Sequence, residues 1–263
     1  MTTKGKEMYK PYSIRSPQFD TTSGGIRVLY GLYGWLLAKG QIAYLNTIVQ
    51  GTESIGIYPE IYRGNELGAS KVVRYILQKP GVMGTTDQYG SFSTGPTKFN
   101  SDDEIYVFSK IYDTFEVSNS HLLFLPIINT HIFKDLHKKR TKTCYLVGKG
   151  VNTNQHPKDA IELTRQFATN QTAFSELLNE CKMLYGYDHM SAAYDIARLC
   201  GCPVTYFGSG SQLELRGYEP GLQGIDFGEG SEFNPHAFRM NYQGLIDKFS
   251  IKLDRFITET QRD

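Results

Sequence analysis

The chain has 263 residues, 40% of them hydrophobic, and a formal net charge of +1. This composition supports well-formed cores and excludes both a disordered chain and a protein that follows a nucleic-acid backbone by bulk positive charge. The longest apolar stretch, residues 28–38, is shorter than the ~20 residues of a membrane-spanning helix, and the N-terminus lacks the apolar core of a signal peptide, so we expect a soluble protein without an integral membrane segment.

In the first half of the chain, short apolar runs alternate with glycine-rich loops and one clear helical pattern. Apolar residues recur at helical spacing from Ile26 to Leu37, and Gly40 stands where that helix should stop. Residues 81–103 have the composition of a long loop, and a connector at 126–141 ends in a basic cluster that we expect to be a solvated turn. The other elements predicted here are strands at residues 12–16, 41–45, 54–58, 104–108 and 121–125, and a helical segment at 69–78.

After the connector, the alternation of strands and helices begins again. A helix is predicted at 171–182, where apolar residues gather on one face. The segment 238–257 carries a strong helical stripe, and a helix this amphipathic must dock on a protein surface. The other elements predicted here are strands at residues 143–147, 160–164, 183–187 and 203–207, and a helix at 191–199.

The order of these elements predicts the fold class. Parallel sheets with crossover helices require strands and helices to alternate in the order β-α-β. The repetition of this order on both sides of a connector indicates an α/β protein with two Rossmann-like domains. We expect an N-terminal domain at 1–130, a second domain at 142–235 and a C-terminal helix at 236–263 that packs back across the domains. Ligands of such folds bind beyond the carboxyl ends of the strands, so we expect the active site in a cleft between the domains.

The first segment with the composition of a ligand site is Ser23-Gly24-Gly25, between a predicted strand and a predicted helix. Two glycines let the backbone approach a ligand closely, and the start of a helix presents free N–H groups and the positive end of its dipole. This combination favours a phosphate group. A plain tight turn is the alternative, since such turns use glycines in the same way.

The second segment, Gly148-Lys149-Gly150, directly follows the strand that opens the second domain. A lysine between glycines at the carboxyl end of a parallel strand can direct its ammonium group into the ligand crevice. There it would neutralise a diphosphate as a point charge. The alternative is a lysine that faces solvent in a turn.

The third segment joins a strand that ends at Asp188 to a helix that opens with Ser191-Ala192. This arrangement supplies a carboxylate for sugar hydroxyls beside the N–H groups of a helix start, which suit a phosphate. The competing interpretation is that Asp188 is the N-cap of the helix, a common structural role for aspartate.

Other cofactor sites find little support in the sequence. Gly148-Lys149-Gly150 and Gly208-Ser209-Gly210 both lack the third glycine of the dinucleotide fingerprint, and no phosphate-binding loop of the P-loop type occurs. There is neither a His-Glu-x-x-His nor an Asp-x-Asp motif, and the four cysteines lack zinc-site spacing. We therefore expect no metal and no bound cofactor, and buried reduced thiols in a cytoplasmic protein.

Taken in order, these motifs resemble the GT-B-fold glycosyltransferases, in particular the retaining group with the signature Glu-x7-Glu. The resemblance covers most of the chain, from the strand, glycine pair and helix of residues 12–40 to the stretch from Ala197 to Val204 that ends in Gly-x-Pro-Val. Tyr58-Pro59-Glu60 and the residues after it are similar to a subgroup found among bacterial and phage surface-polysaccharide enzymes.

This resemblance implies a nucleoside-diphosphate sugar as donor, bound mainly by the second domain, and a saccharide or other hydroxyl acceptor. Counting back from Gly201-x-Pro203, the first carboxylate of the signature falls on Asp188, the expected catalytic residue, and the second falls on Ile196, where the chain departs from the family. Glu60 is either a polar group on the acceptor side or a structural residue. The expected donor-binding residues are Ser23, Gly24, Gly25, Lys149, Ser191 and Ala192.

The expected function is therefore metal-independent transfer of a sugar, of the hexosyltransferase type and with retention, in which catalysis rests on positioning and on stabilising the leaving diphosphate. Two alternatives stay open. Ile196 in place of a carboxylate fits a non-catalytic relative that binds a nucleotide sugar or a glycan. A dinucleotide-dependent oxidoreductase or epimerase on a similar scaffold would have to act without a complete glycine fingerprint.

Overall fold

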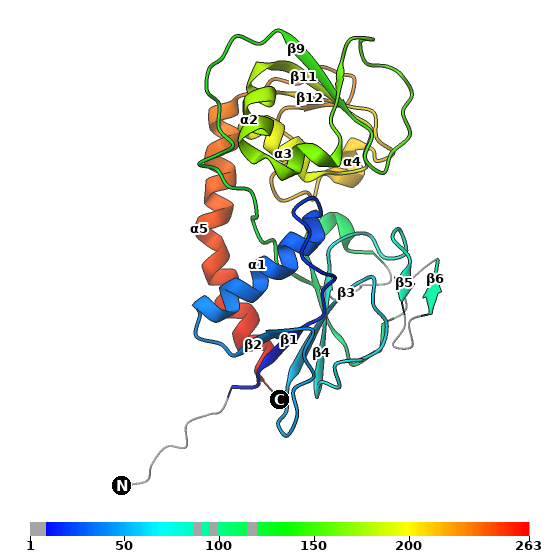
Figure 1. Cartoon of the computed structure of the whole chain (residues 1–263), viewed down its shortest axis with the longest axis vertical. Helices are drawn as coiled ribbons and strands as arrows, with labels where there is room; N and C mark the ends of the chain where they lie inside the picture. The colour runs from blue at the N-terminus through cyan, green and yellow to red at the C-terminus, as the bar shows by residue number, and fades with distance from the viewer. Residues whose placement is uncertain (1–8, 87–90, 95–98, 115–119, 263) are drawn as a thin grey trace. The chain divides into compact units, whose positions relative to one another are not determined.

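The computed structural model describes residues 9–86, 91–94, 99–114 and 120–262. Within these ranges the chain forms two compact units, each built on a parallel sheet of its own (Figure 1). The first unit is drawn from residues 1–20, 25–125 and 249–263, and the second from residues 21–24 and 126–248. The protein is thus α/β with two large parallel sheets, an architecture compatible with a Rossmann-like fold.

In the described residues, the sheet of the first unit has six strands, and every neighbouring pair is parallel. The predicted strands of this half are confirmed, most of them shorter than the apolar runs that indicated them. A short antiparallel pair, β5 (Thr85–Thr86) and β6 (Phe92–Ser93), lies within the predicted long loop. The spatial order of the six strands is β2 (Ala43–Leu45), β1 (Tyr12–Ile14), β3 (Ile55–Pro59), β4 (Lys71–Ile76), β7 (Glu104–Val107) and β8 (His121–Leu122).

Helix α1 (Gly24–Ala38) connects β1 to β2 and confirms the predicted amphipathic helix. It ends close to the predicted stop, since Gly40 has a φ of +75° and its N–H donates to the Leu37 carbonyl oxygen at 2.9 Å. The side chains that the helix buries in the core follow helical spacing and are Val28, Leu29, Leu32 and Leu36.

Residues 69–78, predicted as a helical segment, contain strand β4 instead, so that prediction is wrong. Strand β4 is hydrogen-bonded on both sides, to β3 and to β7. Val73, Tyr75 and Ile76 are at most 1% exposed, and the Arg74 guanidinium is buried in an ion pair with Asp103 at 2.7 Å. A strand buried on both faces carries apolar residues without alternation, so periodicity alone does not distinguish it from a buried helix.

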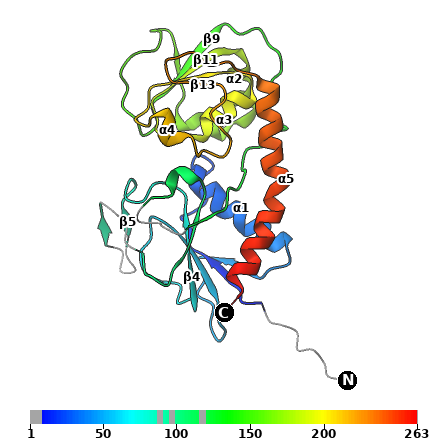
Figure 2. The ribbon, with the colours of Figure 1, turned by 180° about the vertical axis from the view of Figure 1, so that it is seen from behind.

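The C-terminal helix α5 (Pro235–Thr260) is continuous, and the division between the two units falls within it (Figures 1 and 2). In the first unit, Phe249 packs edge-on against Trp35 with ring centroids 5.3 Å apart. In the second unit, the Tyr242 hydroxyl accepts a hydrogen bond from the Ile128 N–H at 3.3 Å. The predicted terminal helix is therefore confirmed, and its apolar side is buried in each unit. Among the described helices, none is long and apolar enough to cross a membrane.

The described part of the second unit contains a five-stranded sheet that is again parallel throughout. Its spatial order is β10 (Ile161–Glu162), β9 (Lys142–Leu146), β11 (Cys181–Gly186), β12 (Val204–Tyr206) and β13 (Ile225–Asp226). Its connecting helices are η3 (Arg165–Thr169), α2 (Gln171–Glu180), α3 (Ala192–Leu199) and α4 (Gln212–Leu215). The predicted strands and helices are confirmed. Strand β13 and helix α4 were not predicted, because they are too short to show periodicity.

The basic cluster at residues 138–140 is not simply a solvated turn, because its last residue is structural. Arg140 pairs with the Asp135 carboxylate at 2.8 Å and donates to the carbonyl oxygens of Cys181 and Cys200 at 3.0 and 2.7 Å. A guanidinium has enough donors to join several backbone segments at once, which the sequence pattern did not indicate. The four cysteines are buried free thiols.

Candidate functional site

The carboxyl ends of β9, β11 and β12 lie side by side, because these strands are parallel neighbours in the second unit. The segments that follow them are residues 148–150, 187–189 and 208–210, and we name this group the strand-end site. Backbone hydrogen bonds hold the ends of the three strands together. The Tyr187 N–H donates to the Leu146 carbonyl oxygen at 2.9 Å, and the Phe207 N–H donates to the Gly186 carbonyl oxygen at 2.7 Å. Ligands of parallel α/β sheets bind at this edge.

Glycines let the segments of the strand-end site approach more closely than side chains would allow. A Cβ atom on Gly148, whose φ is +57°, would lie 2.3 Å from the Oδ2 atom of Asp188. A Cβ atom on Gly150 would lie 1.8 Å from the Tyr187 carbonyl oxygen, and one on Gly208 would lie 2.4 Å from the Asp188 carbonyl oxygen. These glycines are therefore required by the packing of the site itself.

Asp188 lies at the centre of the strand-end site and is 8% exposed. Burial raises the pKa of its carboxyl group, while the Lys149 charge and hydrogen bonds from the backbone N–H groups of Lys149 and His189 act in the opposite direction. The Tyr194 hydroxyl donates to the Asp188 backbone carbonyl at 2.9 Å. The Asp188 carboxylate thus joins the loop after β9 to the end of β11, and it lies close to an exposed lysine.

The N-cap of α3 is Ser191, whose hydroxyl accepts a hydrogen bond from the Ala193 N–H at 3.3 Å. The alternative that made Asp188 the N-cap is therefore wrong. The helix begins at Ala192, so the predicted helix start is confirmed. Capping of α3 therefore does not explain why an aspartate stands at position 188.

Neither Ile196 nor its neighbour Asp195 supplies a second carboxylate to a ligand. Ile196 is buried in α3. The Asp195 carboxylate pairs with Arg198 at 2.5 Å and accepts a hydrogen bond from the Tyr218 hydroxyl, also at 2.5 Å. Since both Asp195 and Arg198 are nearly inaccessible to solvent, this pair belongs to the core of the second unit.

The remaining predicted site residues are divided between the two units. Ser23 and Gly24 are grouped with the second unit, and Gly25 and Glu60 with the first. Gly24 and Gly25 form the first turn of α1 rather than a loop before it. Glu60 follows β3, is 4% exposed, and accepts a hydrogen bond from the Leu77 N–H at 2.8 Å. That contact gives Glu60 a structural role.

Sequence reasoning missed the tyrosines that brace the strand-end site. The Tyr206 hydroxyl donates to the His189 carbonyl at 2.7 Å and accepts from the Gly210 N–H at 3.1 Å. The Tyr187 hydroxyl is 2.8 Å from Nδ1 of His156. One signal was present, because Gly-x-Gly follows two predicted strands, at 148–150 and at 208–210. The sequence indicated the pair at 208–210 only as an incomplete dinucleotide motif.

The chemical groups that the site offers are backbone N–H groups, the exposed Lys149 ammonium and the Asp188 carboxylate. This combination suits a ligand that carries both an anionic group and hydroxyls. Within the described residues, no group of three or more His, Cys, Asp and Glu side chains is arranged to hold a metal ion. Comparison with known proteins gives no match, either to a protein-family model or to a curated protein.

Replacing Gly150 with alanine is expected to destabilise the second unit by about 2–3 kcal/mol, because the new methyl group overlaps the Tyr187 carbonyl. Gly34 provides the control, since it is exposed in α1 and a Cβ atom there meets nothing within 4 Å. Gly34→Ala should be neutral or stabilising by up to about 1 kcal/mol. Urea unfolding followed by circular dichroism measures both, and equal stability of Gly150→Ala and the wild type would contradict the packing described above.

Proposed function

We propose that this protein is a GT-B-type glycosyltransferase that moves a sugar from a nucleoside-diphosphate donor to a saccharide or other hydroxyl acceptor. The observation that carries the proposal is the strand-end site, where an exposed lysine and a carboxylate lie at the carboxyl edge of a parallel sheet. The start of α3 follows Asp188 within four residues and adds free backbone N–H groups.

In this proposal, the Lys149 ammonium neutralises the donor diphosphate, with the N–H groups at Ser191-Ala192 as further donors. The Asp188 carboxylate accepts a hydrogen bond from a sugar hydroxyl. Ser23-Gly24-Gly25, at the start of α1, is a second helix start whose N–H groups suit a phosphate. The catalytic effect comes from orienting the donor and stabilising the leaving diphosphate, and requires no metal.

A second candidate function is binding of a nucleotide sugar or glycan without catalysis. It is favoured by the state of Asp195, whose carboxylate is held in a buried pair with Arg198. With Ile196 at the second signature position, Asp188 is then the single carboxylate that the signature positions offer to a ligand. Donor binding without release of a nucleoside diphosphate, across a panel of acceptors, would favour this second candidate.

Binding of nucleoside-diphosphate sugars tests the proposed function through Lys149. We expect one or more donors of a panel to raise the Tm of the wild-type protein, and Lys149→Gln to weaken that binding about tenfold or more. Lys158→Gln is the matched control, because Lys158 is an exposed lysine in the same β9–β10 connection and lies outside the strand-end site. Absence of a thermal shift with every donor, or equal binding by Lys149→Gln and the wild type, would contradict the proposal.

A further inference from the structure

The segment 134–142, which leads into β9, presents most of its basic side chains to solvent. Lys134, Lys138, Lys139 and Lys142 are exposed, and so is Leu136, which is 40% exposed. We name these five residues the basic patch. They belong to the second unit, and none of them belongs to the strand-end site.

The backbone of the basic patch is held on the last turn of α2. The Asn179 side chain accepts a hydrogen bond from the Leu136 N–H at 2.6 Å and donates to the Lys134 carbonyl oxygen at 3.0 Å. The Arg140 guanidinium pairs with Asp135 and donates to the Leu178 carbonyl oxygen at 3.1 Å. Since the segment is already fixed in place, little backbone ordering is left to oppose binding of a partner at its exposed side chains.

One carboxylate serves two of the lysines in the basic patch. Lys142 and Lys138 both face Glu180, the last residue of α2, with Nζ–carboxylate oxygen distances of 2.5 and 3.9 Å. In the part of the chain that the structure describes, the ammonium groups of Lys134 and Lys139 have neither a hydrogen-bond nor an ion-pair partner. These two cations are therefore free to meet an anion outside the chain.

The basic patch also carries an excess of positive charge. Residues 134–142 together with Glu180 hold five positive and two negative charges, which gives +3 with His137 neutral. Glu176, one turn earlier on α2, and Lys182, near the start of β11, add one charge of each sign and leave this balance unchanged. Exposed cations spread along a surface segment suit an extended anionic surface, because a single small anion requires cations that converge on a cavity.

Leu136 indicates which kind of extended anion fits the basic patch. A leucine flanked by lysines can enter the interfacial layer of a lipid bilayer while the long lysine side chains keep their ammonium groups at the level of the headgroups. A nucleic acid or an acidic polysaccharide has no apolar phase for this side chain. The combination of unpaired lysines and an exposed leucine therefore favours a membrane surface.

We propose that the basic patch docks the second unit on a membrane surface that contains anionic lipids. The ammonium groups of Lys134, Lys138 and Lys139 contact the anionic headgroups, and Leu136 enters the boundary with the acyl chains. Such a contact is peripheral and reversible, and salt weakens it because the lysines are exposed. This inference is independent of the proposed glycosyltransferase activity.

Co-sedimentation of the full chain with lipid vesicles tests this proposal. Vesicles of phosphatidylcholine with about 30% phosphatidylserine should bind the wild-type protein at least about tenfold more tightly than vesicles of phosphatidylcholine alone. Raising the salt concentration from about 0.1 M to about 0.5 M should release the protein, because it screens exposed charges. The double variant Lys134→Gln, Lys139→Gln should weaken binding about tenfold or more, since each lysine near an anionic surface contributes about a factor of five.

Two further variants make the result specific. Leu136→Ser should weaken binding to the anionic vesicles about threefold, because a polar side chain replaces the apolar one at the acyl boundary. The matched control Lys79→Gln, Lys248→Gln removes the same number of charges from exposed lysines outside the basic patch, and it should bind as the wild type does. Circular dichroism checks that each variant is folded, and Lys138→Gln replaces the double variant should that one fail to fold.

The proposal is overturned by equal binding to vesicles with and without phosphatidylserine, or by wild-type affinity in the folded lysine variants or in Leu136→Ser. Binding to the soluble polyanions heparin or polyuridylate that is tighter than binding to the anionic vesicles would overturn it as well, since the basic patch would then serve a soluble polyanion.

Discussion

Arg198→Met is expected to destabilise the second unit by about 3–5 kcal/mol, because it leaves the Asp195 carboxylate buried without its cation. The Arg198 side chain is 0% exposed and pairs with Asp195 at 2.5 Å. It also donates to the carbonyl oxygens of Gly221 and Gln223 at 2.7 and 2.8 Å, and its guanidinium lies 4.0 Å from the ring centroid of Phe238. Methionine supplies none of these donors, so two backbone carbonyls lose a donor and the buried Asp195 carboxylate loses its cation at the same time.

Urea unfolding measured by circular dichroism tests this prediction, with Arg165→Met as the control because Arg165 is exposed in η3. The fluorescence of the single tryptophan, Trp35, reports on the first unit and separates its unfolding from that of the second. The double variant Asp195→Leu, Arg198→Met removes both charges and should recover much of the loss. A loss below about 1 kcal/mol for Arg198→Met would indicate a solvated pair, and Asp195 would then become a candidate ligand group.

Asp188→Asn is expected to reduce kcat/KM of the proposed sugar transfer about a hundredfold, since a neutral amide replaces the charged acceptor of a sugar hydroxyl. The same change should leave the free energy of unfolding at pH 7 equal to that of the wild type or higher. The reason is that burial raises the pKa of Asp188, which means that the folded protein holds the ionised carboxylate at a disadvantage. Activity and stability should therefore move in different directions.

The sign of the pH dependence follows from the same shift. A carboxyl group whose pKa is raised on folding binds its proton more tightly in the folded protein, so its contribution to stability is full below the ordinary value of 3.8 and is lost as the pH rises through the raised pKa. The Asp188→Asn variant has no carboxyl group at this position, so it does not lose this stability as the pH rises. Its stability relative to the wild type should therefore increase as the pH rises from about 4 through the raised pKa.

Assays of nucleoside-diphosphate release and urea unfolding between pH 4 and 7.5 measure these two effects. Asp159→Asn is the matched control, because Asp159 is an exposed aspartate in the β9–β10 connection, and both activity and stability should stay at wild-type values. Unchanged kcat/KM in Asp188→Asn would remove Asp188 from the proposed mechanism. A stability difference that shrinks as the pH rises would contradict the direction of the pKa shift.

The candidate site was only partly accessible from the sequence. Asp188, Lys149 and the start of α3 were recognised because each stands at the end of a predicted strand or at a helix boundary, where ligands of parallel sheets bind. The tyrosines that brace the site, and the second glycine pair at 208–210, were not recognised. Their roles depend on hydrogen bonds to His189 and close contact with the Asp188 carbonyl, which arise only when β11 and β12 are paired.

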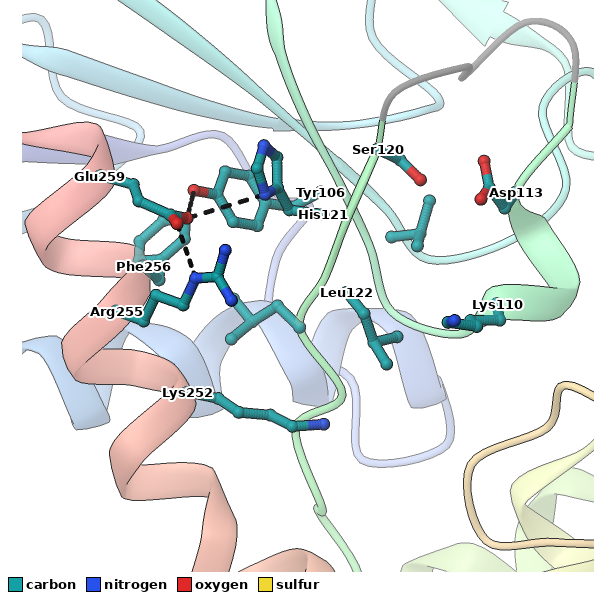
Figure 3. A pocket seen from close by; sticks show the side chains of 12 residues that line it. Tyr106, Lys110, Asp113, Ser120, His121, Leu122, Lys252, Arg255, Phe256 and Glu259 are labelled. Carbon is teal, nitrogen blue, oxygen red and sulfur yellow. Dashed lines mark hydrogen bonds and ion pairs between the residues drawn. The ribbon is translucent and has the colours of Figure 1, made fainter.

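The structure has a pocket in the first unit, beside β7, β8 and the C-terminal part of α5, that left no signal in the sequence (Figure 3). Lys110, Ser120 and Lys252 come from three separate segments, and no spacing along the chain relates them. Asp195 illustrates the same limit in the second unit. Its carboxylate stands next to the second signature position, but burial and the pair with Arg198 make it part of the core.

The sequence by itself determined that this chain is α/β, where α1, α2, α3 and α5 lie, and where most strands lie, because helical periodicity and short apolar runs are properties of neighbouring residues. Only the tertiary structure decided that residues 71–76 are a strand buried on both faces rather than a helix. It also decided which strand ends meet and which charged side chains are buried. Strand pairing and burial depend on contacts between residues far apart in the chain, and local patterns do not encode those contacts.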